Sequence, residues 1–419
     1  MKVLVVGSGG REHAIVKALN LSPSVSEVHV VPGNPGMAVE ALCHSEVDTE
    51  DFAGLVSLIR RNDLDFVVVG PEGPLAAGLS DALREAGILV FGPSCAGAQL
   101  EASKIFAKIF MRDANIPTAH FTEVGSVDEV LRAVSDEQPP FVLKADGLAA
   151  GKGVFICQSL VEVEEAAHNI FEKKILGEAG RSAIVERFQK GWELSYLILT
   201  NGQSWEALPL AQDHKRLRDG DQGPNTGGMG VIAPIAIGPE LNERIERTVL
   251  RPIMDGLRAR EVLYRGVLYV GLMVTEDGPQ VLEFNARFGD PEAQVILPLL
   301  DGDWGEVMLK VAQGELPQLK WKPLYSACVV LAAESYPESP VKNVVIGGDV
   351  SGSTPSSYFI HAGTGRNPRG QWITQGGRVL NSVGLGSTLQ EAVANAYRQA
   401  EFVRWPGLQM RRDIGEKIL

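Results

Sequence analysis

Three polar side chains at alternate positions, Glu283, Asn285 and Arg287, carry the clearest chemical signal in the sequence. Residues 281–285 alternate as in a β-strand, so Glu283 and Asn285 project to the same face of a sheet. Their oxygens suit Mg²⁺, which proteins bind through one or two carboxylates together with substrate phosphates. Arg287 reaches that face if the strand geometry persists, where it can contact phosphoryl oxygens. The alternative is an exposed strand whose polar face is merely solvated. Residues earlier in the chain help to decide between a metal site and a solvated face.

Three lysines upstream of that strand can neutralise a polyphosphate. Lys104 lies on a helix predicted from residue 100 to about residue 114. Lys144 and Lys152 belong to a hairpin over residues 140–156, with Lys144 in the first strand and Lys152 in a loop rich in glycine and alanine. The loop is not a Walker A motif, because a glycine and a strand follow its lysine. Such a loop can fold over a triphosphate and exclude water, although a plain hairpin turn is the alternative.

Further candidates for ligand contacts lie between residues 182 and 230. A strand over residues 182–188 presents a carboxylate and a ring that can hold adenine, and a later carboxylate can reach ribose hydroxyl groups. Asp213 lies in a dense polar cluster, whose His214 has no His or Cys partner at metal spacing, which argues against zinc. A glycine-rich loop follows, and such loops bring backbone amides close to small ligands. The candidates here are Glu186, Phe188, Glu193, Asp213, Gly227 and Gly228.

The elements that position these residues begin with an α/β pattern in the first hundred residues. Apolar runs at 2–6, 27–31, 66–70 and 88–92 alternate with helical segments, which predicts a doubly wound parallel sheet. Each run ends near Gly or Pro, so the ligand crevice is expected at the carboxyl ends of the strands.

The first glycine turn, Gly7-Ser-Gly-Gly10, resembles a dinucleotide fingerprint but departs from it. Glu12 replaces the third glycine, and the second strand lacks the acidic residue that holds the ribose. A glycine turn at a helix N-terminus still binds phosphate through its amides. Arg11 in the first helical turn runs against the macrodipole preference, which hints at an anionic ligand. An exposed arginine beside a purely structural turn is the alternative.

Length and composition narrow the class of protein. From 419 residues we expect two to four domains, and a net charge of −13 argues against nucleic acid as the main partner. The four cysteines are far apart and form no CxxC motif, which is typical of buried thiols in a reducing compartment. No signal-peptide pattern is present and no apolar run approaches the ~18 residues of a membrane span, so we expect a cytoplasmic protein. Residues 325–419 read as a small α+β unit without an obvious catalytic constellation.

Together, in order and with their spacing, the motifs closely resemble the glycinamide ribonucleotide synthetase family of the ATP-grasp superfamily. The resemblance covers essentially the whole chain. The matching motifs span residues 7–13, 70–74, 100–104, 144–153, 212–216, 223–230 and 283–292.

The resemblance implies a multidomain α/β and α+β fold. It comprises an N-terminal doubly wound parallel-sheet domain (1–103), an ATP-grasp core (104–320) with a small mobile lid at about 120–190, and a small C-terminal α+β domain (325–419). It further implies ligation of 5-phosphoribosylamine and glycine with ATP, through glycyl phosphate, in purine biosynthesis. The expected requirements are ATP and Mg²⁺ or Mn²⁺, and the expected partners are small molecules, with no nucleic acid, no membrane and a monomeric state.

The resemblance also implies a role for each candidate residue. Glu283 and Asn285 would hold the metal, and Arg287, Lys152 and Asp213 would act in catalysis. ATP would be bound by Lys104, Lys144, Lys152, Glu186, Phe188 and Glu193. The substrates would be bound by Gly9, Gly10, Arg11, Glu72, Gly227, Gly228 and Asp290. The family commonly has two adjacent acidic residues in the adenine strand, whereas Arg187 follows Glu186 here, so a side-chain contact from position 187 is not carried over.

Three other functions compete with this assignment. Another ATP-grasp ligase, such as a phosphoribosyl carboxylate ligase or a biotin-dependent carboxylase relative, would share Glu283 and Asn285, but the motifs at 70–74 and 223–230 favour the glycine ligase. A nicotinamide dehydrogenase is opposed by the missing ribose carboxylate. A non-catalytic nucleotide-binding module is opposed by the complete set of lysines and metal ligands.

Overall fold

The computed structural model describes residues 1–149 and 152–418. Its N-terminal sheet has the order β3-β2-β1-β4-β5, and every pair of neighbouring strands is parallel. Alternate side chains of β1 are buried on opposite faces, Val3 and Val5 with helix α1 (Gly10–Asn20) and Leu4 and Val6 with helix α2 (Phe52–Arg61). The doubly wound sheet predicted from the apolar runs is therefore confirmed. Its other elements are β1 (Lys2–Gly7), β2 (Glu27–Pro32), η1 (Met37–Val39), β3 (Leu42–Cys43), β4 (Phe66–Val69), α3 (Glu72–Ala76), α4 (Leu79–Glu85) and β5 (Leu89–Phe91).

Two helices, α5 (Cys95–Ala102) and α6 (Lys104–Asp113), connect this domain to the rest of the chain. The single helix predicted over residues 100–114 is wrong, because Ser103 is extended (φ −129°, ψ 118°) and its hydroxyl caps α6 by accepting from the Phe106 N–H. The carboxylate of Asp146 stabilises the break by accepting from the Ser103 hydroxyl and from the Ile105 N–H, both at 2.8 Å. Lys104 consequently occupies the first position of a new helix.

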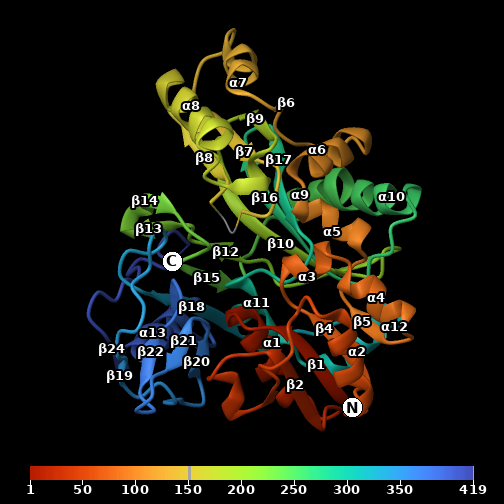
Figure 1. Cartoon of the computed structure of the whole chain (residues 1–419), viewed down its shortest axis with the longest axis vertical. Helices are drawn as coiled ribbons and strands as arrows, with labels where there is room; N and C mark the ends of the chain where they lie inside the picture. The colour runs from red at the N-terminus through yellow and green to blue at the C-terminus, as the bar shows by residue number, and fades with distance from the viewer. Residues whose placement is uncertain (150–151, 419) are drawn as a thin grey trace.

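The segment predicted as a lid, called the lid below, forms a four-stranded sheet with the order β6-β9-β7-β8, covered by its own helices at the top of Figure 1. Its helices and strands enclose a hydrophobic cluster of their own. The lid therefore has its own small core beside the larger cores of the molecule. Its elements are β6 (Phe121–Val124), α7 (Val127–Val134), β7 (Phe141–Ala145), β8 (Val154–Cys157), α8 (Leu160–Ala167), a π-helical turn η2 (His168–Glu172), η3 (Gly177–Gly180) and β9 (Ala183–Arg187).

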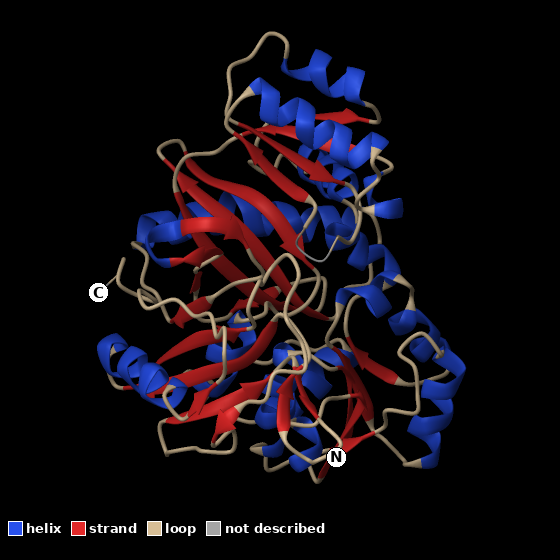
Figure 2. Cartoon of the chain, turned by 60° about the vertical axis from the view of Figure 1, so that its left-hand side comes forward, coloured by secondary structure: helices blue, strands red, loops and turns tan. Residues whose placement is uncertain are grey.

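The central sheet, β11-β10-β16-β17, is antiparallel and forms the floor beneath the lid. Figure 2 shows its long strands running between the lid and the lower part of the molecule. The antiparallel pairing predicted for residues 266–275 with 280–285 is confirmed, with Glu283 opposite Gly271 and Asn285 opposite Tyr269. The elements are β10 (Trp192–Thr200), β11 (Trp205–Ala207), α9 (Pro239–Ile245), η5 (Glu246–Leu250), α10 (Arg251–Ala259), β16 (Gly266–Thr275) and β17 (Gly278–Asn285).

A five-stranded sheet joins segments from the middle and the end of the chain. Its order is β12-β15-β18-β23-β20, so two strands from within residues 104–320 extend a sheet of the C-terminal region, and β15 pairs directly with β18. Helix α13 (Leu389–Ala400) packs against β18 and β23 and completes this unit. The strands are β12 (Gln212–Asp213), β15 (Gly230–Ala233), β18 (Tyr325–Ala332), β20 (Ser357–His361) and β23 (Arg378–Gly386).

The remaining elements are short hairpins and connecting helices. Among the helices that the structure describes, none is both long and apolar enough to cross a bilayer. The predicted multidomain α/β and α+β class is confirmed by these sheets. The remaining elements are β13 (Arg216–Arg218), η4 (Asp219–Asp221), β14 (Gln222–Asn225), α11 (Glu292–Ile296), η6 (Leu297–Leu299), α12 (Trp304–Gln313), β19 (Gly347–Gly348), β21 (Thr364–Arg366), β22 (Trp372–Thr374) and β24 (Val403–Arg404).

Candidate functional site

A cavity of about 380 Å³ lies where the N-terminal domain, the lid, the central sheet and the C-terminal sheet meet. That volume lies within the range of small-molecule sites, and charged groups dominate the lining. Nine of the residues singled out from the sequence line it, so the fold collects motifs that are distant along the chain. They are Arg11, Glu72, Lys104, Asp213, Gly227, Glu283, Asn285, Arg287 and Asp290.

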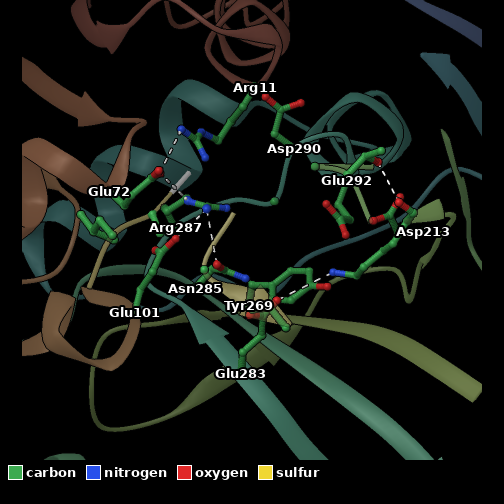
Figure 3. A pocket seen from close by; sticks show the side chains of 18 of the residues that line it. Arg11, Glu72, Glu101, Asp213, Tyr269, Glu283, Asn285, Arg287, Asp290 and Glu292 are labelled. Carbon is green, nitrogen blue, oxygen red and sulfur yellow. Dashed lines mark hydrogen bonds and ion pairs between the residues drawn. The ribbon is translucent and has the colours of Figure 1, made fainter. Parts of the chain in front are cut away.

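The floor of the cavity carries the two candidate metal ligands, whose side chains point into the same space (Figure 3). Glu283 lies 3.4 Å from the Lys104 ammonium and 3.7 Å from that of Lys215. Burial opposes ionisation of Glu283, but the lysines outweigh it and lower the pKa of this carboxyl to about 2. Glu283 is therefore an ionised oxygen donor beside the amide oxygen of Asn285.

This donor set fits a hard divalent cation that is shared with a polyanionic substrate. A carboxylate and an amide oxygen are two of the ligands that Mg²⁺ accepts, and phosphate oxygens and water complete its octahedron. Within residues 1–149 and 152–418, no group of three or more His, Cys, Asp or Glu side chains could hold a metal ion without such help. The site is thus suited to a metal that arrives with its substrate.

Two arginines on one side of the cavity are fixed by carboxylates (Figure 3). Arg287 pairs with Glu101 at 2.6 Å and with Glu72 at 3.2 Å, and Arg11 lies 3.8 Å from Glu72 and 2.6 Å from Glu12. Burial opposes ionisation of Glu72, but Arg287 and Arg11 outweigh it and lower its pKa to about 2. The anchored guanidinium groups hold their positions before an anion arrives, which is the preorganisation that electrostatic catalysis requires.

Glu186, expected from the sequence at the nucleoside, has a different environment in the fold. Its buried carboxylate pairs with Lys108 at 2.8 Å and with Lys144 at 2.9 Å. Burial opposes its ionisation, but Lys144 and Lys108 outweigh it and keep the pKa of Glu186 below its ordinary value. Lys144 also donates to the Leu282 carbonyl at 3.1 Å, so the lid contacts the strand that carries Glu283. The buried ammonium of Lys144 is thus balanced by a protein carboxylate.

Three other predicted ATP-binding residues do not line the cavity. Glu193 lines a small adjoining pocket with Lys215 and Glu283, and Phe188 is half-buried just after β9. Lys152 is exposed, and Ala150 and Gly151 of the predicted lysine loop lie outside the described residues.

The N-terminal glycine turn and Gly228 also lie beside the cavity. Gly9 donates its N–H to Glu12 at 2.7 Å. Gly10 has no room for a side chain, because a Cβ would lie 2.6 Å from Asn381 Nδ2. A Cβ on Gly228 would lie 2.8 Å from Asp213 Oδ1.

Arg187, which stands where the family commonly has an acidic residue, pairs with another residue of the lid. Arg187 donates two hydrogen bonds to Glu137, at 2.7 and 2.9 Å, across the surface of the lid. The pair is exposed, and the Arg187 side chain points toward Glu137 and not into the cavity.

Two carboxylates on the opposite side of the cavity differ from the others. Glu72, Glu101, Glu283 and Asp290 each pair with a lysine or arginine, whereas Asp213 and Glu292 form no ion pair with any described residue. Burial and the neighbouring Glu292 raise the pKa of Asp213 to about 7. A buried carboxylate without a cationic partner favours a bound cation or a proton.

Sequence reasoning missed three residues in this region. The Glu292 carboxylate accepts a hydrogen bond from the Ser195 hydroxyl at 3.0 Å, and that hydroxyl lies 3.1 Å from the phenol oxygen of Tyr269. Glu292 was inside a recognised motif, and Tyr269 lies opposite Asn285 in the sheet register. Ser195 and Tyr269 come close to Glu292 and Asn285 only through the pairing register of the central sheet, which no local sequence pattern predicts.

The C-terminal region also reaches the cavity, although its sequence predicted no chemistry there. Arg378 of β23 lines the cavity and pairs with Asp290 at 3.2 Å. Burial opposes ionisation of Asp290, but Arg378 and Arg11 outweigh it and lower its pKa. Asp290 also accepts from Gln294 at 2.7 Å.

Comparison with known proteins connects this geometry to one family. Models of phosphoribosylglycinamide synthetase match the chain in three parts, the N domain at residues 1–101, the ATP-grasp (A) domain at 102–293 and the C domain at 326–417. Phosphoribosylamine–glycine ligases of Nostoc sp. and Neisseria meningitidis serogroup A are 45% and 42% identical, each over 100% of both chains.

Solved structures agree with the sequence comparison. The crystal structure of phosphoribosylamine–glycine ligase from Thermotoga maritima is 34% identical, covers 99% of this chain and 100% of its own, and superposes with a TM-score of 0.85. The biotin carboxylase domain of the Hydrogenobacter thermophilus 2-oxoglutarate carboxylase is 19% identical, with a TM-score of 0.74 over 98% of this chain and 91% of its own. At that identity it shares the fold alone.

Proposed function

The chain belongs to the phosphoribosylglycinamide synthetase family, and from this premise we propose how its cavity joins 5-phosphoribosylamine to glycine with conversion of ATP to ADP and phosphate. It is an ATP-dependent carbon–nitrogen ligase of purine biosynthesis. One observation supports placing the reaction in this cavity. Anchored arginines lie across ionised Glu283 and the neighbouring Asn285 amide from two carboxylates, Asp213 and Glu292, that pair with no described lysine or arginine. A single cavity therefore suits phosphate, a divalent cation and an amine.

In the first step, a carboxylate oxygen of glycine attacks the γ-phosphorus of ATP, and ADP leaves. Transfer of this kind depends on positioning and charge neutralisation more than on covalent catalysis. Lys104, Lys152 and Arg287 would neutralise the phosphate oxygens. Glu283 and Asn285 would hold the divalent cation, for which we propose Mg²⁺ because both ligands are hard oxygens. When bound, that cation screens the negative charge of the β- and γ-phosphates.

In the second step, the amine nitrogen of 5-phosphoribosylamine attacks the acyl carbon of glycyl phosphate. The carbon–oxygen bond to phosphate breaks, inorganic phosphate leaves and the nitrogen loses a proton. We propose Asp213 as the acceptor of this proton, since burial and Glu292 raise its pKa to about 7. A base with a pKa near the working pH combines an ionised fraction with useful basicity.

The cavity also suggests where each substrate lies. We propose that Gly9, Gly10, Arg11 and Glu72 contact 5-phosphoribosylamine, and that Gly227, Gly228 and Asp290 surround glycine. ATP would lie under the lid against Lys144, Phe188 and Glu193. The Glu186 backbone would contact adenine, because its carboxylate is engaged by Lys108 and Lys144.

We propose that the monomer is the active unit, because residues of one chain line the whole cavity. The reaction is tested by ADP release in the presence of Mg²⁺, ATP, glycine and 5-phosphoribosylamine generated from ribose 5-phosphate and ammonia. ADP release is expected only when both glycine and the amine are present. Release that does not depend on glycine would overturn the substrate assignment.

A further inference from the structure

The backbone of Gly227 is held at its N–H and at its carbonyl by two side chains of the C-terminal region. Its N–H donates to the Tyr336 hydroxyl at 3.0 Å, and its carbonyl accepts from Nη1 of Arg378 at 2.5 Å. The same Nη1 donates to the Asp290 carbonyl at 2.6 Å, and Nη2 pairs with the Asp290 carboxylate at 3.2 Å. Arg378 therefore joins the Gly227 loop to the segment that follows the metal-binding strand.

The position of this loop decides how much room remains beside Asp213. Gly228 has φ +106°, and a Cβ there would lie 2.8 Å from Asp213 Oδ1 and 2.6 Å from Pro291 Cδ. Its N–H donates to Thr226, which is itself bonded to the Lys215 carbonyl. Two consecutive glycines offer no side chain for packing, so the loop depends on hydrogen bonds from outside it for a fixed position.

We propose that Tyr336 and Arg378 are positioning residues of the ligase, which hold the Gly227–Gly228 peptides against Asp213 and thereby set the affinity for glycine. The inference rests on the proposed function, and it gives the C-terminal domain a part in substrate binding. Neither side chain is required to contact the reacting atoms, because both act through the backbone of the loop.

Two conservative variants separate positioning from general stability. Tyr336→Phe removes one hydroxyl and keeps the ring, which packs beside Gly377. Arg378→Lys keeps the positive charge beside Asp290 and loses the geometry that lets one guanidinium nitrogen bridge two carbonyls. The matched control is Arg366→Lys, since Arg366 belongs to the same domain, donates to the Gly370 carbonyl at 2.7 Å and stacks on Trp372 away from the cavity.

Steady-state kinetics test the proposal in the full-length enzyme. Loss of a single hydrogen bond predicts that Tyr336→Phe raises the KM for glycine about three- to tenfold, and that Arg378→Lys raises it about tenfold. The KM for ATP should change by less than about twofold, and the control should match the parent enzyme. The double variant should raise the KM by less than the product of the single effects, because both residues hold the backbone of one residue, Gly227.

Hydrogen exchange tests the same clamp without substrates or turnover. The segment that contains Gly227 should exchange faster in Tyr336→Phe than in the parent protein, with unchanged exchange in β16. An unchanged glycine KM, an equal change in the KM for ATP, or unchanged exchange at Gly227 would each overturn the proposal. A parent enzyme without glycine-dependent ADP release would instead overturn the proposed function, and the exchange experiment would still report on the clamp.

Discussion

Replacing Glu292 with glutamine should move the acid limb of the pH–rate profile to lower pH. Asp213 must be ionised to accept the proton of the attacking amine, so turnover falls as the pH drops below its pKa of about 7. Burial is the largest cause that raises this pKa, and the charge of Glu292 is the next. Glu292→Gln removes that charge and keeps an oxygen that can accept from Ser195, at 3.0 Å in the parent protein.

The size of the expected shift follows from how far the pKa of Asp213 lies above its ordinary value. The ordinary value for Asp213 is 3.8 and the folded value is about 7, and burial, which the variant retains, accounts for the largest part. A neighbouring like charge typically accounts for about one pH unit or somewhat more, equivalent to about 1.4 kcal/mol. The acid limb should therefore move down by about one pH unit.

The assay is glycine-dependent ADP release between about pH 5.5 and 9 at saturating substrates, with parent and variant measured in parallel. Ionisation of the substrates is common to both enzymes and cancels in the comparison. Asp213→Asn serves as the control, since without the carboxylate the limb should be lost along with most of the activity. An acid limb that stays in place in Glu292→Gln, or that moves to higher pH, would refute the assignment of Asp213 as the base.

Two further predictions concern the floor and the arginine side of the cavity. Glu283→Ala should abolish turnover and retain the melting temperature, whereas Glu276→Ala on the same hairpin should leave both unchanged; near-normal turnover in Glu283→Ala would remove that residue from the metal site. Arg287→Met should lower the free energy of unfolding by about 3 kcal/mol in urea titrations, because it leaves the buried Glu101 without its partner. The comparison is Arg181→Met, whose pair with Glu178 is exposed and should contribute less than about 1 kcal/mol; equal losses in the two variants would contradict this reasoning.

The parts of the fold that the sequence predicted are those set by local pattern. Buried apolar runs predicted the parallel strands, and the alternation around Glu283 and Asn285 predicted one face for two metal ligands. Both follow from residues within a few positions of each other. Arg11 was singled out because a basic residue in the first turn of a helix runs against the macrodipole preference, whereas Glu72 was expected from the family resemblance alone.

What the sequence did not predict depends on contacts between distant segments. The break at Ser103 requires the carboxylate of Asp146, 43 residues away. Arg378 reaches Asp290 from 88 residues further along the chain, from a unit that showed no catalytic pattern of its own. Lys108 shares a helix face with Lys104 at a spacing of four residues, yet only the sheet of the lid brings Glu186 to it.

In the proposed reaction the glycine carboxylate is phosphorylated before the amine attacks it. Glycine labelled with ¹⁸O in both carboxylate oxygens tests it most directly, with inorganic phosphate and glycinamide ribonucleotide analysed by mass spectrometry after one round of turnover. One ¹⁸O atom is expected in the phosphate and one in the new amide. Phosphate without ¹⁸O, or label recovered in AMP, would contradict it.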